Sequence, residues 1–284
     1  MKKILFSLIS FFIGISIVSA DTKKIINKSD PIRKKTAFVL VHGAWHGGWC
    51  WKKLIPLLTR AGAAVYTPTL TGLGERSHLL NDNINLDTHI QDIVSMIEFE
   101  DLHDIILVGH SYAGFVIAGV AEKVPERISA LVFLDALIPD DGKAVLDFLS
   151  ETAKNIYYES QKNNDNSWKL LFSQKVDISE LGVFNRKDAE WIESRMTEQP
   201  HNTYSQKIRI SESTAKLINK KGFFILTSER QDFIAEYKRA SERGLKLFKI
   251  DGAGHNSMIT QPEKLAYILL NLKTAKKSGG KIKN

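Results

Sequence analysis

Short apolar runs alternate with amphipathic segments along most of the chain. Apolar runs bounded by glycine, proline or polar residues predict buried strands at 37–41, 64–66, 105–108, 128–134, 222–227 and 245–250. Apolar residues spaced three or four apart predict helices at 51–61, 87–99, 115–121, 232–243 and 262–272. Strands that alternate with helices are typical of a mostly parallel sheet with helices on both faces. We therefore expect an α/β fold of this architecture.

The alternation stops between residues 140 and 219, where the sequence becomes polar and mixed. Short apolar runs at 144–149 and 168–172 have helical spacing. A segment of this length is too long for a plain connecting loop. We expect a mainly helical cap, inserted into a single domain that spans residues 37–272.

The first twenty residues have the pattern of a secretory signal peptide. A basic start is followed by an apolar run at 4–18 and by small residues up to Ala20. This pattern predicts cleavage after Ala20 and a secreted or periplasmic protein. The alternative is an uncleaved anchor, since the apolar run is just under membrane-spanning length. No other stretch is long enough to span, so stable membrane insertion is not expected after cleavage.

Composition excludes some classes of function. The chain has 284 residues, of which 43% are hydrophobic and 25% charged, with a formal net charge of +7. Much of the positive excess lies in a flexible leader at 21–36 and a disordered tail at 273–284. Basic and aromatic residues do not interleave on one face, so nucleic acid is not an expected partner. Cys50 is the single cysteine, which excludes an intrachain disulfide and multi-cysteine metal sites.

One stretch has the pattern of a catalytic nucleophile. The predicted strand at 105–108 leads through Gly109 and His110 to Ser111, and a predicted helix follows. A serine on a sharp strand-to-helix turn exposes its hydroxyl beside the N–H groups that open the helix. Ala113 stands where G-x-S-x-G has its second glycine, and Gly114 follows it. The plainer interpretation is a polar strand end before a glycine-rich helix start.

A serine nucleophile needs a general base, and His255 is the first candidate among eight histidines. It follows the last predicted strand in a glycine-flanked turn, where its ring can reach over the sheet end. The histidines of the glycine loop after the first strand have other expected roles. His42 would hydrogen bond the loop backbone, and His46 would line the pocket. His110 adjoins the nucleophile but would point away from the elbow.

The acid that orients the base should follow a strand and lie between the serine and the histidine in the chain. Glu229 is the first choice, two residues past Thr227. Asp135, at the end of the preceding strand, is a strong alternative. Asp232 comes third, because it would also serve as a helix cap.

The oxyanion that forms when a serine attacks a carbonyl needs two N–H donors. The backbone of Tyr112, directly after the serine, is one candidate. The backbone of Ala44, in the glycine loop, is the other. Three tryptophans of this region would line an apolar pocket or pack in the core: Trp45, Trp49 and Trp51.

Taken together, these motifs resemble the α/β-hydrolase superfamily. The residues that carry the resemblance lie at 39–49, 108–114 and 252–255, with further similarity to bacterial esterases at 69–78 and 134–142. Within the superfamily, the chain is most similar to the branch of bacterial carboxylesterases, pyrethroid-hydrolysing esterases, plant methylesterases and hydroxynitrile lyases.

The resemblance implies Ser111 as nucleophile, His255 as base, and Ala44 and Tyr112 as N–H donors. Hydroxynitrile lyases carry a threonine in the oxyanion loop and a lysine just after the histidine, where this chain has Gly43 and Asn256. Haloalkane dehalogenases and epoxide hydrolases use an aspartate as nucleophile, at the position where this chain has Ser111. The resemblance therefore argues against these enzymes and against hydroxynitrile lyases. Members of the branch often have aspartate where this chain has glutamate at 229.

The sequence therefore predicts a serine hydrolase that cleaves a small carboxylic ester through an acyl-enzyme, without cofactor or metal. A second hypothesis is a non-catalytic protein that binds a small ligand on the hydrolase fold. A third is a lactone or carbon–carbon bond hydrolase. The substrate and the oligomeric state are left open by the sequence.

Overall fold

A computed structural model describes residues 36–162, 169–170 and 178–272. The predicted signal peptide, nearly all of the basic leader and the C-terminal tail lie outside these residues. Within the described part of the chain, no helix combines the length and apolar character that a membrane span requires.

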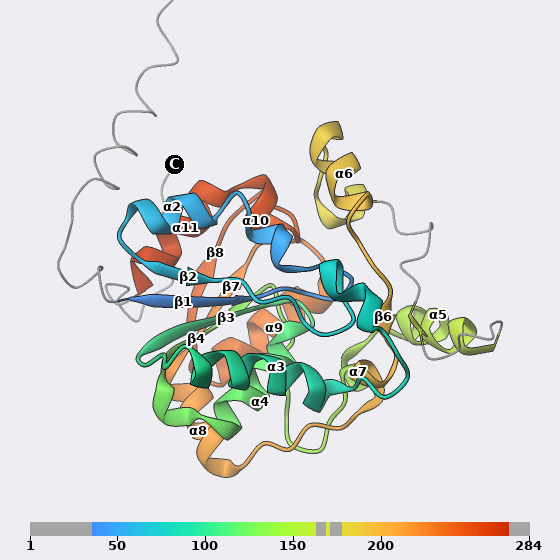
Figure 1. The fold of residues 1–284 in the computed structure, drawn as a ribbon, viewed down its shortest axis with the longest axis horizontal. Helices are drawn as coiled ribbons and strands as arrows, with labels where there is room; N and C mark the ends of the chain where they lie inside the picture. The colour runs from blue at the N-terminus through green and yellow to red at the C-terminus, as the bar shows by residue number, and fades with distance from the viewer. Residues whose placement is uncertain (1–35, 163–168, 171–177, 273–284) are drawn as a thin grey trace, which may run out of the picture.

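Six parallel strands form the central sheet, in the order β2-β1-β3-β4-β7-β8 (Figure 1). Their bounds are β1 Ala37–Val41, β2 Ala64–Tyr66, β3 Ile105–His110, β4 Ile128–Leu134, β7 Gly222–Leu226 and β8 Lys246–Lys249. These are the strands predicted from the apolar runs, with ends displaced by no more than two residues. The α/β architecture predicted from the sequence is confirmed.

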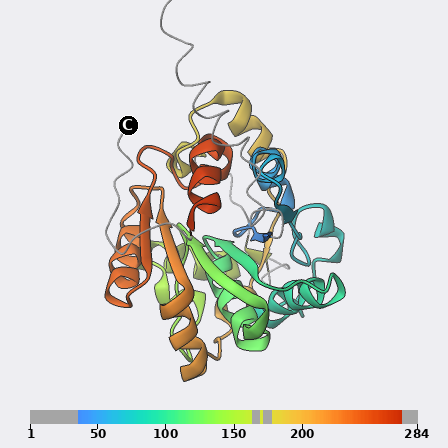
Figure 2. The same cartoon turned by 90° about the vertical axis from the view of Figure 1, so that its left-hand side faces the viewer.

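Helices cover both faces of the sheet (Figures 1 and 2). One face carries α3 Leu86–Phe99, α4 Ala113–Lys123, α8 Glu212–Lys221 and α9 Gln231–Glu242. The other carries α2 Ile55–Arg60, α10 Ser257–Thr260 and α11 Pro262–Leu270. Because side chains alternate along a strand, Val39 and Val41 of β1 pack in the first core and Phe38 and Leu40 in the second. In Figure 2, α2 and α11 lie side by side although they come from opposite ends of the described chain.

Local sequence explains several helix ends. The side chain of Asn85 accepts a hydrogen bond from the Thr88 N–H, and the Thr88 hydroxyl accepts one from the Asn85 N–H, which fixes the start of α3. The predicted helix at 51–61 is shorter in the structure. A 3-10 turn, η2 Gly48–Trp51, comes first, and α2 starts at Ile55 with Pro56 in its first turn.

The cap stands at one end of the sheet, on the right of Figure 1. Its described elements are η5 Val145–Phe148, α5 Glu151–Lys162, β5 Lys169–Leu170, η6 Ile178–Leu181, α6 Arg186–Glu193, β6 Gln199–Pro200 and α7 Asn202–Ser205. The predicted helix at 168–172 is wrong for the two residues described there, because Lys169 and Leu170 pair with β6 as an antiparallel ladder. The expected end of the cap at 219 is too late, since α8 packs on the sheet beside α4.

Candidate active site

Ser111 lies on a strained turn between β3 and α4. Its φ is +57°, in the left-handed region that non-glycine residues rarely adopt. Hydrogen bonds hold this turn: Ser111 N–H donates to Leu134 O at 3.2 Å, and Ser111 O accepts from Gly114 N–H at 3.1 Å and from Leu137 N–H at 3.2 Å. The surrounding backbone therefore imposes the strain that exposes the serine into the cavity.

Two glycines make this turn possible. A Cβ at Gly109 would lie 2.6 Å from Ala113 O, and a Cβ at Gly114 would overlap Leu137 O. Gly114 is needed where α4 crosses the loop after β4. The second small position of the elbow is therefore shared between Ala113 and Gly114, which explains the loose match to G-x-S-x-G.

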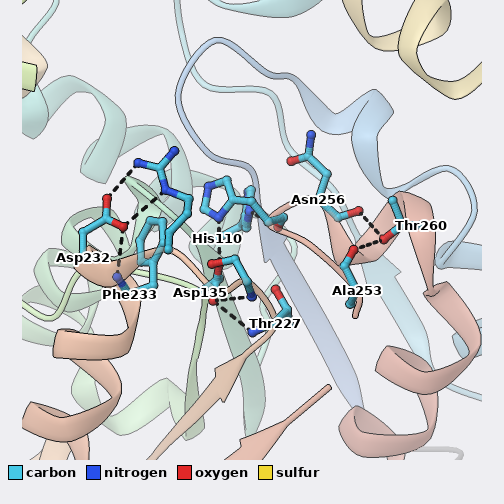
Figure 3. A network of polar contacts seen from close by, with 11 residues as sticks. His110, Asp135, Thr227, Asp232, Phe233, Ala253, Asn256 and Thr260 are labelled. Atoms are coloured by element: carbon cyan, nitrogen blue, oxygen red, sulfur yellow. Dashed lines mark hydrogen bonds and ion pairs between the residues drawn. The ribbon is translucent and has the colours of Figure 1, made fainter. Parts of the chain in front are cut away.

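The structure pairs His255 with Asp135. His255 Nδ1 lies 2.8 Å from Asp135 Oδ2, and the Asp135 side chain is fully buried. The other carboxylate oxygen, Oδ1, accepts from Thr227 N–H at 3.0 Å and from Ser228 N–H at 3.3 Å (Figure 3). Each oxygen of the buried carboxylate therefore has a donor, which lowers the cost of burying its charge.

The first choice for the acid, Glu229, does not fit this geometry. Glu229 is exposed, whereas Asp135 holds the histidine. The reason is the strand order: β4 lies next to β7, so the residue after β4 is fixed by the N–H groups that end β7. Asp232 lies in the first turn of α9, where it pairs with Arg230 at 2.8 Å and accepts from the Phe233 N–H at 3.1 Å, but the cap position of the helix is Arg230.

Hydrogen-bond partners assign the tautomers of the histidines. A carboxylate only accepts, so His255 carries its proton on Nδ1 and leaves the Nε2 lone pair free to take one. His110 Nε2–H donates to the carbonyl of His255 at 2.9 Å, across 145 residues of sequence. We expected His110 to point away from the elbow; it lines the cavity and holds the His255 backbone. No local sequence signal could have revealed that contact.

His42 organises the glycine loop after β1, as expected. Its Nδ1–H donates to Gly43 O at 2.8 Å, and its Nε2 accepts from Leu70 N–H at 3.1 Å. Burial lowers the pKa of His42 to about 3 and that of His46 to about 4. Burial also holds the pKa of His110 well below its usual range. These three rings are therefore neutral, and none places a positive charge beside His255.

Two backbone N–H groups point to an oxyanion site. Ala44 and Tyr112 both line the cavity together with Ser111. Within the described residues, neither of their N–H groups has a hydrogen-bond partner. The next N–H in the loop, that of Trp45, donates to Gln199 Oε1 of the cap at 3.2 Å. A developing negative charge beside Ser111 would thus meet unpaired donors from two elements.

The cavity, about 290 Å³ in volume, has two unlike sides. Beside Tyr112 it is aromatic: Tyr204 stacks on Tyr112 with ring centroids 5.6 Å apart and an interplanar angle of 3°. Beside His255 it is mixed, with Phe233 stacked on the histidine at 4.6 Å and with Arg230 and Asp232 at the wall. Tyr204 comes from the cap, where the sequence pattern had singled out no site residue.

The tryptophans of the glycine loop divide between the two expected roles. Trp45 lines the cavity, and its Nε1–H donates to Leu170 O at 3.1 Å. Trp51 is fully buried in the core. Trp49 stacks on His46 with ring centroids 5.3 Å apart, and His46 lines the cavity as expected. Among the described residues, no group of three or more potential ligands is placed to hold a metal ion.

Comparison with known proteins identifies the family of the chain. Residues 38–266 match the alpha/beta hydrolase family, and the chain belongs to that family. It is 53% identical over 112 residues to the carbendazim hydrolyzing esterase of Nocardioides sp. (strain SG-4G), a match covering 39% of this chain and 46% of that protein. It is 31% identical over 170 residues to methylesterase 1 of Arabidopsis thaliana, covering 57% of this chain and 64% of the relative. The chain therefore spans less than two thirds of the length of these relatives.

A solved structure supports the same fold. An extracellular alpha/beta-hydrolase from a Paenibacillus species superposes with a TM-score of 0.72 at 23% identity, over 83% of this chain and 98% of that one. The superfamily and branch expected from the sequence motifs are confirmed by these matches.

Proposed function

We propose that this protein is a serine esterase that cleaves a small carboxylic ester through an acyl-enzyme on Ser111. The observation that carries the proposal is the 2.8 Å hydrogen bond between His255 and Asp135, on the same cavity as a serine held at a φ of +57°. The ends of three strands thus bring together a nucleophile, a base whose free nitrogen is assigned, and an acid that orients the base.

The reaction follows from these positions. Ser111 Oγ attacks the ester carbonyl while His255 Nε2 takes the hydroxyl proton. The N–H groups of Ala44 and Tyr112 donate to the tetrahedral oxyanion. As the intermediate collapses, His255 returns the proton to the leaving alcohol. A water molecule, deprotonated by His255, then cleaves the acyl-enzyme, while the Asp135 carboxylate stabilises the imidazolium at each stage.

Two of the relatives support cleavage of an ester. The names of these two, a carbendazim hydrolyzing esterase and a methylesterase, describe ester hydrolysis. The aromatic wall beside Tyr112 favours an apolar acyl group, and the volume of about 290 Å³ favours a small one.

A fluorophosphonate probe tests the proposal directly. We expect stoichiometric phosphonylation of the wild-type protein, with the adduct mapped to the peptide that contains Ser111. Ser111→Ala should take up no probe and should lower hydrolysis of p-nitrophenyl acetate by about four orders of magnitude or more. Ser129→Ala is the matched control, because Ser129 Oγ donates to Asp104 O at 2.8 Å at the opposite end of β4.

Either of two results would contradict the proposal. One is a folded wild-type protein that takes up no probe at a concentration that labels a reference serine hydrolase. The other is a Ser111→Ala protein that turns over the ester at the wild-type rate. Tight binding of a small ligand without any adduct would favour the non-catalytic binding protein instead.

A further inference from the structure

The turn that carries His255 is held from two directions. From the sheet side, His110 Nε2–H donates to the His255 carbonyl at 2.9 Å. From the cap side, the N–H of Asn256 donates to Leu181 O at 3.3 Å. The second contact comes from a part of the chain with no other role in the chemistry described above.

Two glycines let the cap reach this turn. Gly182 and Gly254 have φ values of +77° and +71°, and their backbones pack directly on each other. A Cβ at Gly254 would lie 2.5 Å from Gly182 Cα and 2.9 Å from Leu181 O, and a Cβ at Gly182 would overlap Gly254 Cα. Contacts this close leave no room for a methyl group on either side unless one backbone moves.

The cap segment that makes the contact is itself well anchored. We call residues Ile178–Val183 the clamp segment. Ile178, Leu181 and Val183 are buried in the core on the side of α2 and α11. Inside the segment, Gly182 N–H donates to Ser179 O at 2.8 Å. Because the segment is packed into the core, it can fix the position of the turn that it touches.

The clamp segment also borders the cavity. Glu180 and Leu181 line it on the side of His255, where the leaving alcohol must lie to receive its proton. One short piece of chain therefore touches both the space for the alcohol and the backbone of the residue after the base.

We propose that the clamp segment positions His255, and that Gly182 and Gly254 are positioning residues for the base. This inference rests on the proposed esterase function. The imidazole ring of His255 is carried by the backbone of this turn. If the turn moved by the width of a methyl group, the ring would therefore shift relative to Asp135 and Ser111. Misplacement of about 1 Å can lower a rate about a hundredfold. The effect should fall on the chemical steps rather than on substrate binding.

Alanine substitutions at four glycines separate this role from general strain. Gly182→Ala and Gly254→Ala add a methyl group at the contact. Gly142→Ala and Gly244→Ala are matched controls, since these glycines have φ values of +72° and +79° but no atom within 4 Å of an added Cβ. All four variants carry the same backbone strain, and only the first two crowd the His255 turn.

The measurements are the rate constant for fluorophosphonate labelling and the separate values of kcat and KM for p-nitrophenyl acetate, each on protein shown to be folded. For Gly182→Ala and Gly254→Ala we expect labelling and kcat to fall about 10- to 100-fold, with KM changed less than about threefold. The two controls should stay within about twofold of wild type. A purely structural role would lower the melting temperature of the variants and leave the labelling rate of the folded protein unchanged.

The outcomes distinguish this inference from the proposed function. Wild-type protein that labels on Ser111, together with Gly182→Ala protein that labels equally fast, overturns the clamp alone. Wild-type protein that takes up no probe overturns the esterase proposal and the clamp with it. If neither glycine variant folds, Ile178→Val loosens the anchor of the segment gently. It should then lower kcat about two- to fivefold at unchanged KM, and a wild-type kcat would overturn the clamp.

Discussion

The carboxyl end of the sheet and the cap hold their site residues in different ways. At the sheet, the backbone sets each position: Ser111 and Asp135 directly follow adjacent strands, with φ values of +57° and +44°. The carboxylate of Asp135 is held by the N–H groups of Thr227 and Ser228. These residues need a particular backbone geometry, so few other side chains could occupy their places.

In the cap, side chains make several of the contacts with the sheet end, beside backbone contacts such as Asn256 N–H to Leu181 O. Trp45 donates to Leu170 O, Gln199 accepts from the Trp45 N–H, and Tyr204 stacks on Tyr112. Its only backbone ladder in the described residues joins Lys169 and Leu170 to β6. Contacts of this kind can be exchanged for others of similar volume. The comparison indicates that the sheet end fixes Ser111 and Asp135 through backbone geometry, whereas much of the cavity lining that the cap contributes consists of side chains.

After loss of the nucleophile, the largest effect is expected at the acid. Asp135→Asn should lower kcat/KM by about a thousandfold to ten-thousandfold. The amide oxygen introduced by this substitution would stay on the Thr227 and Ser228 N–H groups, so the amide NH₂ would face His255 Nδ1. That contact would move the histidine proton to Nε2 and remove the base. Steady-state kinetics with p-nitrophenyl acetate measures the loss.

Glu229→Gln is the matched control for this experiment. Glu229 is exposed and follows the neighbouring strand, so we expect the kcat/KM of this variant to stay within about twofold of wild type. The reverse pattern, with the loss in Glu229→Gln alone, would show that the sheet end does not select the acid as described.

Acid should destabilise the fold through its buried histidines. Burial lowers the pKa of His42 to about 3 and the pKa values of His46 and His89 to about 4, whereas the unfolded chain has a histidine pKa of about 6.5. Between these values the unfolded state binds more protons, so the free energy of unfolding falls as the pH falls. Each ring should contribute a loss of about 2 kcal/mol by about pH 5. Urea titrations at several pH values measure this slope.

Single histidine variants separate the contributions to that slope. His42→Gln removes one buried titrating group and should make the dependence on pH shallower by nearly one proton. An unchanged slope in His42→Gln would show that His42 is not held neutral by burial.

The smallest effect is expected in the cap. Tyr204→Ala removes the ring stacked on Tyr112, and kcat/KM for p-nitrophenyl benzoate should fall about tenfold, which corresponds to about 1.4 kcal/mol. Turnover of p-nitrophenyl acetate should change less, because its acyl group does not reach the aromatic wall. Tyr158→Ala is the control, since Tyr158 is 52% exposed. Equal losses for both esters would mean that Tyr204 supports the framework rather than the choice of ester.

Much of the framework could be predicted from the sequence. Buried strands and amphipathic helices have periods that local sequence displays, so the sheet strands and most of the long helices on its faces were found within a few residues. The exception among the long helices is α8, which the sequence analysis assigned to the cap. The elbow was also visible, because a serine between glycines at a strand-to-helix boundary is a local pattern. Its detailed fit was not, since Gly114 is required by Leu137 O, which lies in a different loop.

The acid shows where local reasoning ends. Asp135 and Glu229 both follow strands, and β4 and β7 are neighbours only in the folded sheet. The structure places Asp135 against His255, 120 residues away in sequence, because the N–H groups that follow β7 hold its carboxylate. A glutamate two residues past Thr227 lies outside that arrangement and faces solvent.

The cap and the glycine contact were decided by the tertiary structure alone. Residues 169–170 look helical in the sequence and form a strand because β6 lies beside them. Gly182 and Gly254 are ordinary turn glycines in the sequence, and their shared contact exists only once the cap has packed on the sheet end. Local periodicity predicts the helices and strands. Pairings between distant residues depend on the free energy of the whole packed chain.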